Sequence, residues 1–133
     1  MAWLEGCGAN KPFKEFDDLT YSSTGLGTQG VNILDGGYCV DNGYCYVKIK
    51  LHSNSVSSGM TIISQLPKPT DFADGDIHCI TSPTELKEWN DAFKIGQPFV
   101  RLNTSTAVNY GRLRAGGAIS NNVEFWVYCK YKC

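Results

Sequence analysis

The clearest pattern along the chain is a strict alternation of apolar and polar positions at its C-terminal end. In the run VEFWVYCKYKC, one set of alternate positions is mostly apolar: Val123, Phe125, Val127, Cys129 and Tyr131. The positions between them are charged or aromatic: Glu124, Trp126, Tyr128, Lys130 and Lys132. Because successive side chains of a strand point to opposite faces, this period of two predicts a strand with one buried face and one solvated face.

A second alternation surrounds a turn signal in the run GYCVDNGYCYVKIKL, residues 37–51. Asp41-Asn42-Gly43 separates two alternating arms, and this composition favours the tight turn of a β-hairpin. On the second arm one face is apolar: Cys45, Val47, Ile49 and Leu51. The other face is aromatic and basic: Tyr44, Tyr46, Lys48 and Lys50. We therefore expect a second half-buried strand.

Further short runs of strand composition follow, separated by loops rich in glycine, serine and asparagine. They are MTIISQL, DIHCIT, PFVRLNTS and YGRLRAGGAIS, at 60–66, 76–81, 98–105 and 110–120. Six or more short strands at spacings of about ten residues are typical of two-sheet proteins. The sequence thus predicts a mainly β protein, an antiparallel β-sandwich or jelly-roll-like fold.

Two other local signals punctuate this pattern. Ser82-Pro83-Thr84-Glu85 has the spacing of a capping box, and apolar residues recur at helical spacing behind it, which predicts one short helix over 83–95. Pro67-Lys68-Pro69 removes two backbone donors directly after the run MTIISQL. The spacing is not that of a PxxP ligand, so we expect it to end the strand rather than to be read by a partner.

The first part of the chain lacks this alternation. Residues 20–30, TYSSTGLGTQG, are rich in glycine, serine and threonine, which is typical of a loop or an extended arm. We expect residues 1–35 to form an N-terminal arm or linker segment, and residues 36–133 to form the β-sandwich head domain.

Composition changes this picture little but excludes several functions. The chain has 133 residues, 42% of them hydrophobic and 19% charged, with a formal net charge of −1. This balance fits one globular domain and gives no long-range attraction to nucleic acid or to an anionic membrane. No apolar run reaches the length of a membrane span, so we expect no membrane insertion. The N-terminal residues have no signal-peptide pattern, so we expect folding in the cytoplasm.

Cysteines and histidines give no clear catalytic or metal motif. The six cysteines stand at positions 7, 39, 45, 79, 129 and 133, without a C-x-x-C pair. We expect free thiols in the core, with one or two disulfides as the alternative, and no metal or other cofactor. The histidines are His52 and His78, and a dyad of Cys79 with His52 is the open alternative for an enzyme. The acidic run TDFADGD lacks the rest of a calcium loop and is expected to be a solvated turn.

Two groups of exposed side chains are candidates for ligand binding. The aromatic group could stack on pyranose rings, the alternative being that it packs in a core or between subunits: Tyr44, Tyr46, Trp126 and Tyr128. The basic group lies on neighbouring predicted strands and could bind an acidic group of a glycan, although arginine is also common on a solvated strand face: Arg101, Arg112 and Arg114.

The order of these elements resembles a known family. The segments GYCYVKIKL, ISQLPKP, FVRLN, GRLRAGGAIS and FWVYCKY follow one another as in C-terminal head domains of tail-fibre and baseplate receptor-binding proteins from phages and prophages of Gram-positive gut bacteria. The resemblance spans residues 36–133, and Leu66-Pro67-Lys68-Pro69 and YGRLRAGGAI are its most specific parts. It implies a β-sandwich head that binds a host cell-surface saccharide or protein receptor without catalysis.

The resemblance further implies a homotrimer, and a place in the virion after folding in the host cytoplasm. The N-terminal arm would join other tail proteins or a neighbouring subunit. Two other classes stay open on the residues alone. One is a stand-alone bacterial carbohydrate-binding or adhesin module, and the other is a small cytosolic enzyme that depends on cysteine.

Overall fold

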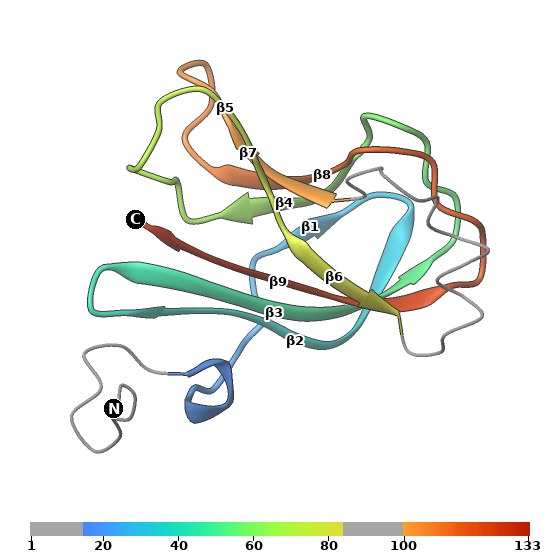
Figure 1. The fold of residues 1–133 in the computed structure, drawn as a ribbon, viewed down its shortest axis with the longest axis horizontal. Coiled ribbons are helices and arrows are strands. Elements are labelled where there is room, and N and C mark those ends of the chain that lie inside the picture. The colour runs from blue at the N-terminus through green and yellow to red at the C-terminus, as the bar shows by residue number, and fades with distance from the viewer. Residues whose placement is uncertain (1–14, 84–99) are drawn as a thin grey trace, which may run out of the picture.

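The computed structural model describes residues 15–83 and 100–133, which form two antiparallel sheets stacked on each other (Figure 1). The five-stranded sheet has the order β1-β4-β8-β7-β5, and its strands are Gly27–Thr28, Thr61–Leu66, Gly111–Ala115, Val100–Thr104 and Gly75–His78. The four-stranded sheet has the order β2-β3-β9-β6, and its strands are Val31–Asp41, Tyr44–Ser53, Glu124–Lys132 and Ile80–Pro83. The predicted antiparallel β-sandwich is confirmed.

The core fills the space between the two sheets. The apolar rows of β3 and β9 supply one side, and Phe125 and Val127 are fully buried, as the alternation predicted. The facing rows of β4, β7 and β8 supply the other: Ile62, Ile63, Leu66, Val100, Leu102 and Leu113. Each buried aliphatic side chain of this kind contributes about 1.5–3 kcal/mol to the stability of the fold by leaving water. Packing in this core therefore holds the two sheets together.

The hairpin between β2 and β3 turns where the sequence predicted it. Asp41 pairs with Tyr44, and the two residues between them are Asn42 and Gly43. Both have positive φ, 51° and 80°, which a type I′ turn requires and which asparagine and glycine adopt at low cost. The turn fixes the register of β3, and Cys45, Val47, Ile49 and Leu51 are all buried as predicted.

The run at 76–81 was expected to be one strand, but the structure divides it between the sheets. β5 ends at His78 and pairs with β7, whereas β6 begins at Ile80 and pairs with β9. Cys79 lies at the crossing, where its N–H donates to the carbonyl of Val100 at 3.0 Å. The expectation of one strand was wrong because residue composition does not indicate which strand each half pairs with.

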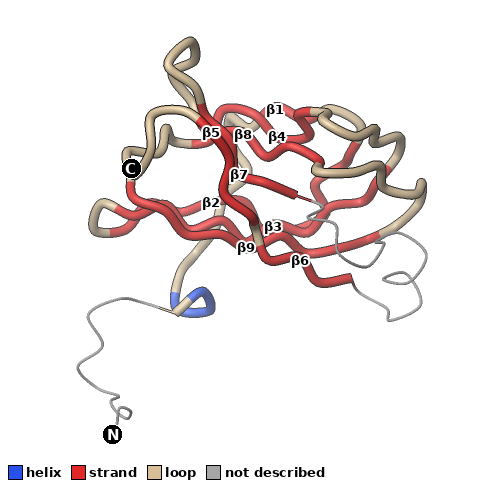
Figure 2. The backbone as a smooth tube through the Cα atoms, turned by 45° about the horizontal axis from the view of Figure 1, so that its top comes forward, coloured by secondary structure: helices blue, strands red, loops and turns tan. Residues whose placement is uncertain are grey.

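The predicted helix start is also wrong. Pro83 belongs to β6 and pairs with Phe125, so a helix cannot begin at this residue. Proline fits here because β6 is the edge strand of its sheet, where a missing N–H is tolerated. The remainder of the predicted helix, 84–95, lies outside the described residues. The helix that the structure does describe is the 3-10 turn η2, Phe16–Asp18, outside the two layers beside the four-stranded sheet (Figure 2).

The Pro67-Lys68-Pro69 segment ends a strand, as predicted. β4 stops at Leu66, and the Tyr131 hydroxyl of β9 donates to the carbonyl of Pro67 at 2.7 Å. The Lys68 ammonium donates to the carbonyls of Ser105 and Val108 in the β7–β8 loop. The segment therefore connects the two sheets and the loop within the molecule.

The segment assigned to an arm contributes to both sheets where it is described. β1 pairs with β4, and β2 already begins at Val31, so the boundary drawn after residue 35 falls inside a strand. Ser22 forms a two-bond bridge with Tyr38 on the outer edge of β2. A two-residue strand and a single bridge are too short to produce an alternating pattern, so the sequence does not indicate them. In the described ranges, no helix is long and apolar enough to cross a membrane.

Candidate functional site

The two groups of candidate residues lie on opposite outer surfaces of the sandwich. The aromatic group projects from β3 and β9 of the four-stranded sheet, at the positions that alternate with core residues. The arginines project from β7 and β8 of the five-stranded sheet, likewise between core positions. A single ligand site that uses all seven side chains is therefore excluded, and each surface has to be considered by itself.

Tyr46 is not available to a ligand. It is 1% exposed, although it lies on the outer face of its sheet. The ring of Phe16 from η2 packs edge-on against it at 5.7 Å between centroids, and the Lys130 ammonium lies 5.2 Å from its ring centre. Tyr46 therefore packs within the protein and does not form part of a ligand surface, because η2 covers this part of the sheet.

Trp126 and Tyr128 form a half-buried pair on β9. Their rings stack at 6.1 Å with an interplanar angle of 24°, and Phe16 contacts Tyr128 edge-on at 5.6 Å. The Lys48 ammonium lies 5.6 Å from the Trp126 ring centre. Tyr44 is half-buried at the far end of β3, where the Lys130 ammonium lies 5.1 Å from its ring. These contacts fix the aromatic rings on the surface before any ligand arrives.

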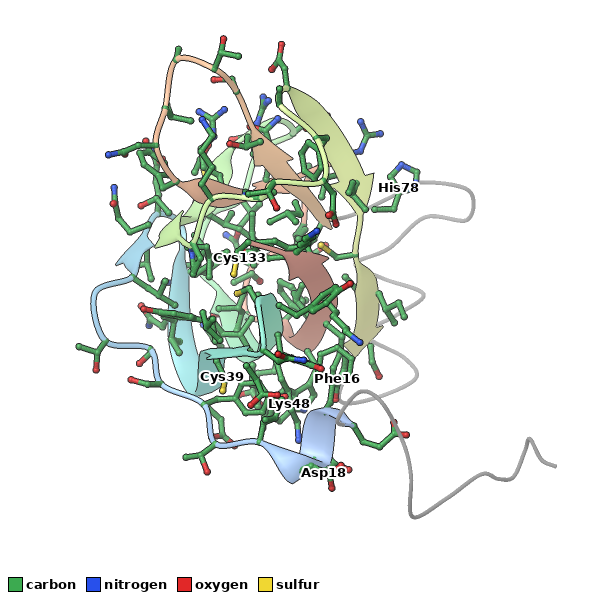
Figure 3. All side chains as sticks on the ribbon, turned by 90° about the vertical axis from the view of Figure 1, so that its left-hand side faces the viewer. Phe16, Asp18, Cys39, Lys48, His78 and Cys133 are labelled. Atoms are coloured by element: carbon green, nitrogen blue, oxygen red, sulfur yellow. The ribbon has the colours of Figure 1, made fainter. Side chains whose placement is uncertain are left out.

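A pocket of about 160 Å³ opens beside Trp126. It is lined by Tyr21, Asp35, Gly36, Lys48 and Trp126, and we call it the Trp126 pocket. Its walls combine a flat aromatic ring, a carboxylate that accepts hydrogen bonds, an ammonium that donates them and a phenol. Figure 3 shows Lys48 and Phe16 on the same side of the sandwich and His78 far from both, on the other sheet.

The backbone of β2 shapes one wall of the pocket. A bulge between Ile33 and Asp35 interrupts the pairing with β3, and the Gly36 N–H donates to the Asp35 carboxylate at 2.8 Å. Gly36 has φ of 74°, and a Cβ there would lie 1.9 Å from the Lys48 carbonyl oxygen. Only glycine fits at this point, so β2 approaches β3 closely enough to set Asp35 beside Lys48.

The charge states of the pocket follow from its surroundings. The Lys48 ammonium donates to the Asp17 carboxylate at 2.8 Å, and this hydrogen bond raises the lysine pKa, so Lys48 is a cation at neutral pH. Burial raises the Tyr21 pKa to about 12, with a smaller effect from Cys39, so its phenol stays neutral. The Tyr21 hydroxyl donates to the Phe16 carbonyl at 2.6 Å, which holds η2 against the sheet.

Of the five pocket residues, Trp126 was predicted as a site residue from the sequence and the other four were not. Tyr21 lies in the glycine-rich segment, where nothing in the pattern distinguishes it. Lys48 was expected only as a residue of a solvated face. Asp35 carries a usable signal, because a Gly-Gly pair directly after it within a strand indicates a bulge or a close backbone approach.

The arginine surface contains an internal network of polar contacts. An Arg112 Nη donates to the Asn103 side-chain oxygen, and the Asn103 amide donates to the Asp76 carboxylate at 2.5 Å. Arg101 lies 3.5 Å from the same carboxylate. Arg114 donates twice to the Gly59 carbonyl, at 3.1 and 3.2 Å.

The described cysteines are free thiols: Cys39, Cys45, Cys79, Cys129 and Cys133. A hydrogen bond with Cys79, together with burial, raises the pKa of Cys129 well above its ordinary value. His52 contacts the Asn54 side-chain oxygen at 3.1 Å, and His78 is exposed. A raised pKa keeps a thiol protonated and poorly nucleophilic. Within residues 15–83 and 100–133, no three metal-ligating side chains gather closely enough to hold an ion.

Comparisons of the chain with protein-family models, with curated proteins and with solved structures found no match.

Alkaline pH should destabilise the protein through its buried acids. Burial raises the Cys45 pKa from 9.0 to about 12, so between pH 9 and 12 the unfolded chain loses this proton more readily than the folded one. The stabilisation that comes from the protonated Cys45 thiol is therefore fully present below pH 9 and is lost as the pH approaches 12. The loss from this thiol is at most about 4 kcal/mol. Urea unfolding at several pH values measures this loss, and a Cys45→Val variant should lose less over the same window. An identical loss in both proteins would contradict this expectation.

Proposed function

We propose that this chain is a non-catalytic binding domain that holds a saccharide in the Trp126 pocket. The observation that carries the proposal is the pocket's combination of a fixed aromatic ring with a carboxylate and an ammonium. Sugars present apolar C–H faces and a rim of hydroxyl groups. Such a ligand needs a flat apolar surface on one side and hydrogen-bonding groups at its edges.

The pocket residues can meet both demands. Trp126 offers a ring face that its stacking on Tyr128 holds in place. Asp35 can accept hydrogen bonds from sugar hydroxyls, and Lys48 can donate to hydroxyl or ring oxygens. Because the ion pair with Asp17 and the bulge at Asp35 already order these groups, a ligand would lose little affinity to their ordering.

The sequence resemblance to phage fibre heads gives this site a biological setting, and we include it in the proposal. The ligand would be a host cell-surface saccharide, the assembly a homotrimer, and the location the virion.

Light scattering should then find three chains in one particle. A monomer would contradict the fibre-head setting and leave the saccharide site of a stand-alone module. Burial raises the pKa values of Cys45 and Cys133, and a hydrogen bond with Cys79, together with burial, raises the pKa of Cys129, which keeps these three thiols protonated and poorly nucleophilic.

Removing the indole should weaken saccharide binding. In a glycan array followed by titration calorimetry, a Trp126→Ala variant should bind the best wild-type saccharide at least about tenfold more weakly, a loss of about 1.4 kcal/mol or more. The matched control is Tyr44→Ala, which removes an aromatic ring from the same sheet face outside the pocket and should bind like the wild type. Equal weakening by both variants, or none by Trp126→Ala, would refute the assignment of the pocket.

A further inference from the structure

The outer face of the five-stranded sheet places two arginines opposite each other, with a histidine beside them. Arg101 on β7 stands directly opposite Arg114 on β8, and His78 on β5 stands opposite Arg101 on the other side. Like charges that face each other across neighbouring strands are destabilising. This register therefore lowers the stability of the isolated sheet, and an anion placed between the cations would reverse that effect.

A second row across this face consists of Asp76, Asn103 and Arg112, and it contains a negatively charged side chain. Asn103 pairs with Arg112 on one side and with Asp76 on the other. Asp76 is the acidic residue among these six positions, and its carboxylate already contacts Arg101 and Asn103. The face thus carries two more positive than negative charges, on a chain whose formal net charge is −1. The positive charge is a local property of this sheet surface.

The arginine side chains are held in place, but two of their N–H donors have no hydrogen-bond partner within the part of the chain that the structure describes. Arg114 is fixed by the Gly59 carbonyl, and Arg112 by Asn103. Among the described residues, the Nε atoms of Arg101 and Arg112 are buried without a hydrogen-bond partner. Such buried donors cost free energy unless a rearrangement of the side chain brings them to an acceptor. Fixed guanidinium groups with remaining donors are suited to recognising planar or multidentate acid groups.

We propose that this face, formed by Asp76, His78, Arg101, Asn103, Arg112 and Arg114, binds an acidic polysaccharide through its carboxylate or sulfate groups. Neighbouring strands lie about 4.8 Å apart, and alternate residues on one strand lie about 7 Å apart, so the guanidiniums form a regular array of cations. That array suits a polymer with an acid group on each repeating unit. The six positions carry no Phe, Tyr or Trp ring for base stacking, which favours a polysaccharide over a single-stranded nucleic acid.

This proposal is independent of the Trp126 pocket, because it concerns the opposite sheet. Biolayer interferometry with immobilised full-length protein can test it, using polygalacturonate for carboxylates, dextran sulfate for sulfates, and neutral dextran. We expect binding of one or both acidic polymers, weakening as NaCl rises from 50 to 300 mM, and no binding of neutral dextran. A Trp126→Ala variant should bind the acidic polymers as the wild type does.

Matched charge changes make the test specific. An Arg101→Gln/Arg114→Gln variant should bind the acidic polymer at least about tenfold more weakly, about 1.4 kcal/mol. The control variant Lys130→Gln/Lys132→Gln removes the same charge from the other sheet and should bind like the wild type. An Arg101→Lys/Arg114→Lys variant keeps the charge and the fold, and should fall between the two because lysine cannot form bidentate contacts.

Three results would overturn the proposal. The first is an equal loss in both glutamine variants, which would indicate attraction by overall charge alone. The second is binding of neutral dextran as strong as that of the acidic polymers. The third is tighter binding of duplex DNA or single-stranded RNA than of polygalacturonate and dextran sulfate, which would assign the face to nucleic acid. Thermal unfolding followed by circular dichroism verifies that each variant is folded.

Discussion

A Gly36→Ala variant should lose about 2–5 kcal/mol of its free energy of unfolding, one of the two largest effects expected from a single substitution. Two causes act together. The residue has φ of 74°, which an L side chain rarely adopts, and its new Cβ would lie 1.9 Å from the Lys48 carbonyl oxygen. Because that oxygen belongs to the backbone of the central strand β3, relief requires the two strands to separate.

Gly43→Ala is the matched control for this prediction. Gly43 has φ of 80°, close to that of Gly36, but a Cβ there would meet no described atom within 4 Å. It should therefore cost only the conformational part, about 1–2 kcal/mol. Urea denaturation of both variants separates the effects of conformation and contact. Equal losses would show that the close approach of β2 to β3 is not required for stability.

A Phe125→Ala variant should lose about 3–5 kcal/mol, the usual cost of removing a buried phenylalanine. Phe125 is fully buried in β9 between the two sheets, and it pairs with Leu51 of β3 and with Pro83 of β6. The loss is a large share of the 5–15 kcal/mol that stabilises a typical domain. Since Trp126 is the next residue on the same strand, the variant should also weaken saccharide binding.

Phe125→Leu keeps most of the apolar volume and should cost less than half as much. Chemical denaturation with both tryptophan fluorescence and circular dichroism should give coincident transitions for each variant. A loss below about 1 kcal/mol for Phe125→Ala would contradict the placement of this side chain in a packed core.

Alternation predicted the faces of β3 and β9 correctly because it depends only on the geometry of one strand. Cys45 and Phe125 are buried, and Lys48 and Trp126 lie on the outer face. The same pattern placed Tyr46 outside but could not show that it is covered. Its cover is Phe16, which lies 30 positions earlier in a segment without periodicity.

Pairing between strands that are distant in the sequence accounts for the remaining differences between the predictions and the structure. The sequence indicates that Trp126 and Arg101 both face outward, but not that their strands belong to different sheets. It likewise does not indicate that the chain changes sheets at Cys79. The Trp126 pocket escaped prediction for the same reason, because Tyr21, Asp35 and Trp126 come from three distant segments. Only the folded backbone brings them together.

Nuclear magnetic resonance can test directly whether a saccharide binds at the Trp126 pocket, as we propose. Amide and indole N–H signals of the labelled protein would be followed while the best-binding saccharide from the array is added. We expect saturable shifts of the Trp126 indole and of the Asp35, Gly36 and Lys48 amides, with the Arg101 and Arg114 amides unchanged. Saturable shifts confined to another surface, or no binding of any saccharide on the array, would contradict a saccharide site at the Trp126 pocket.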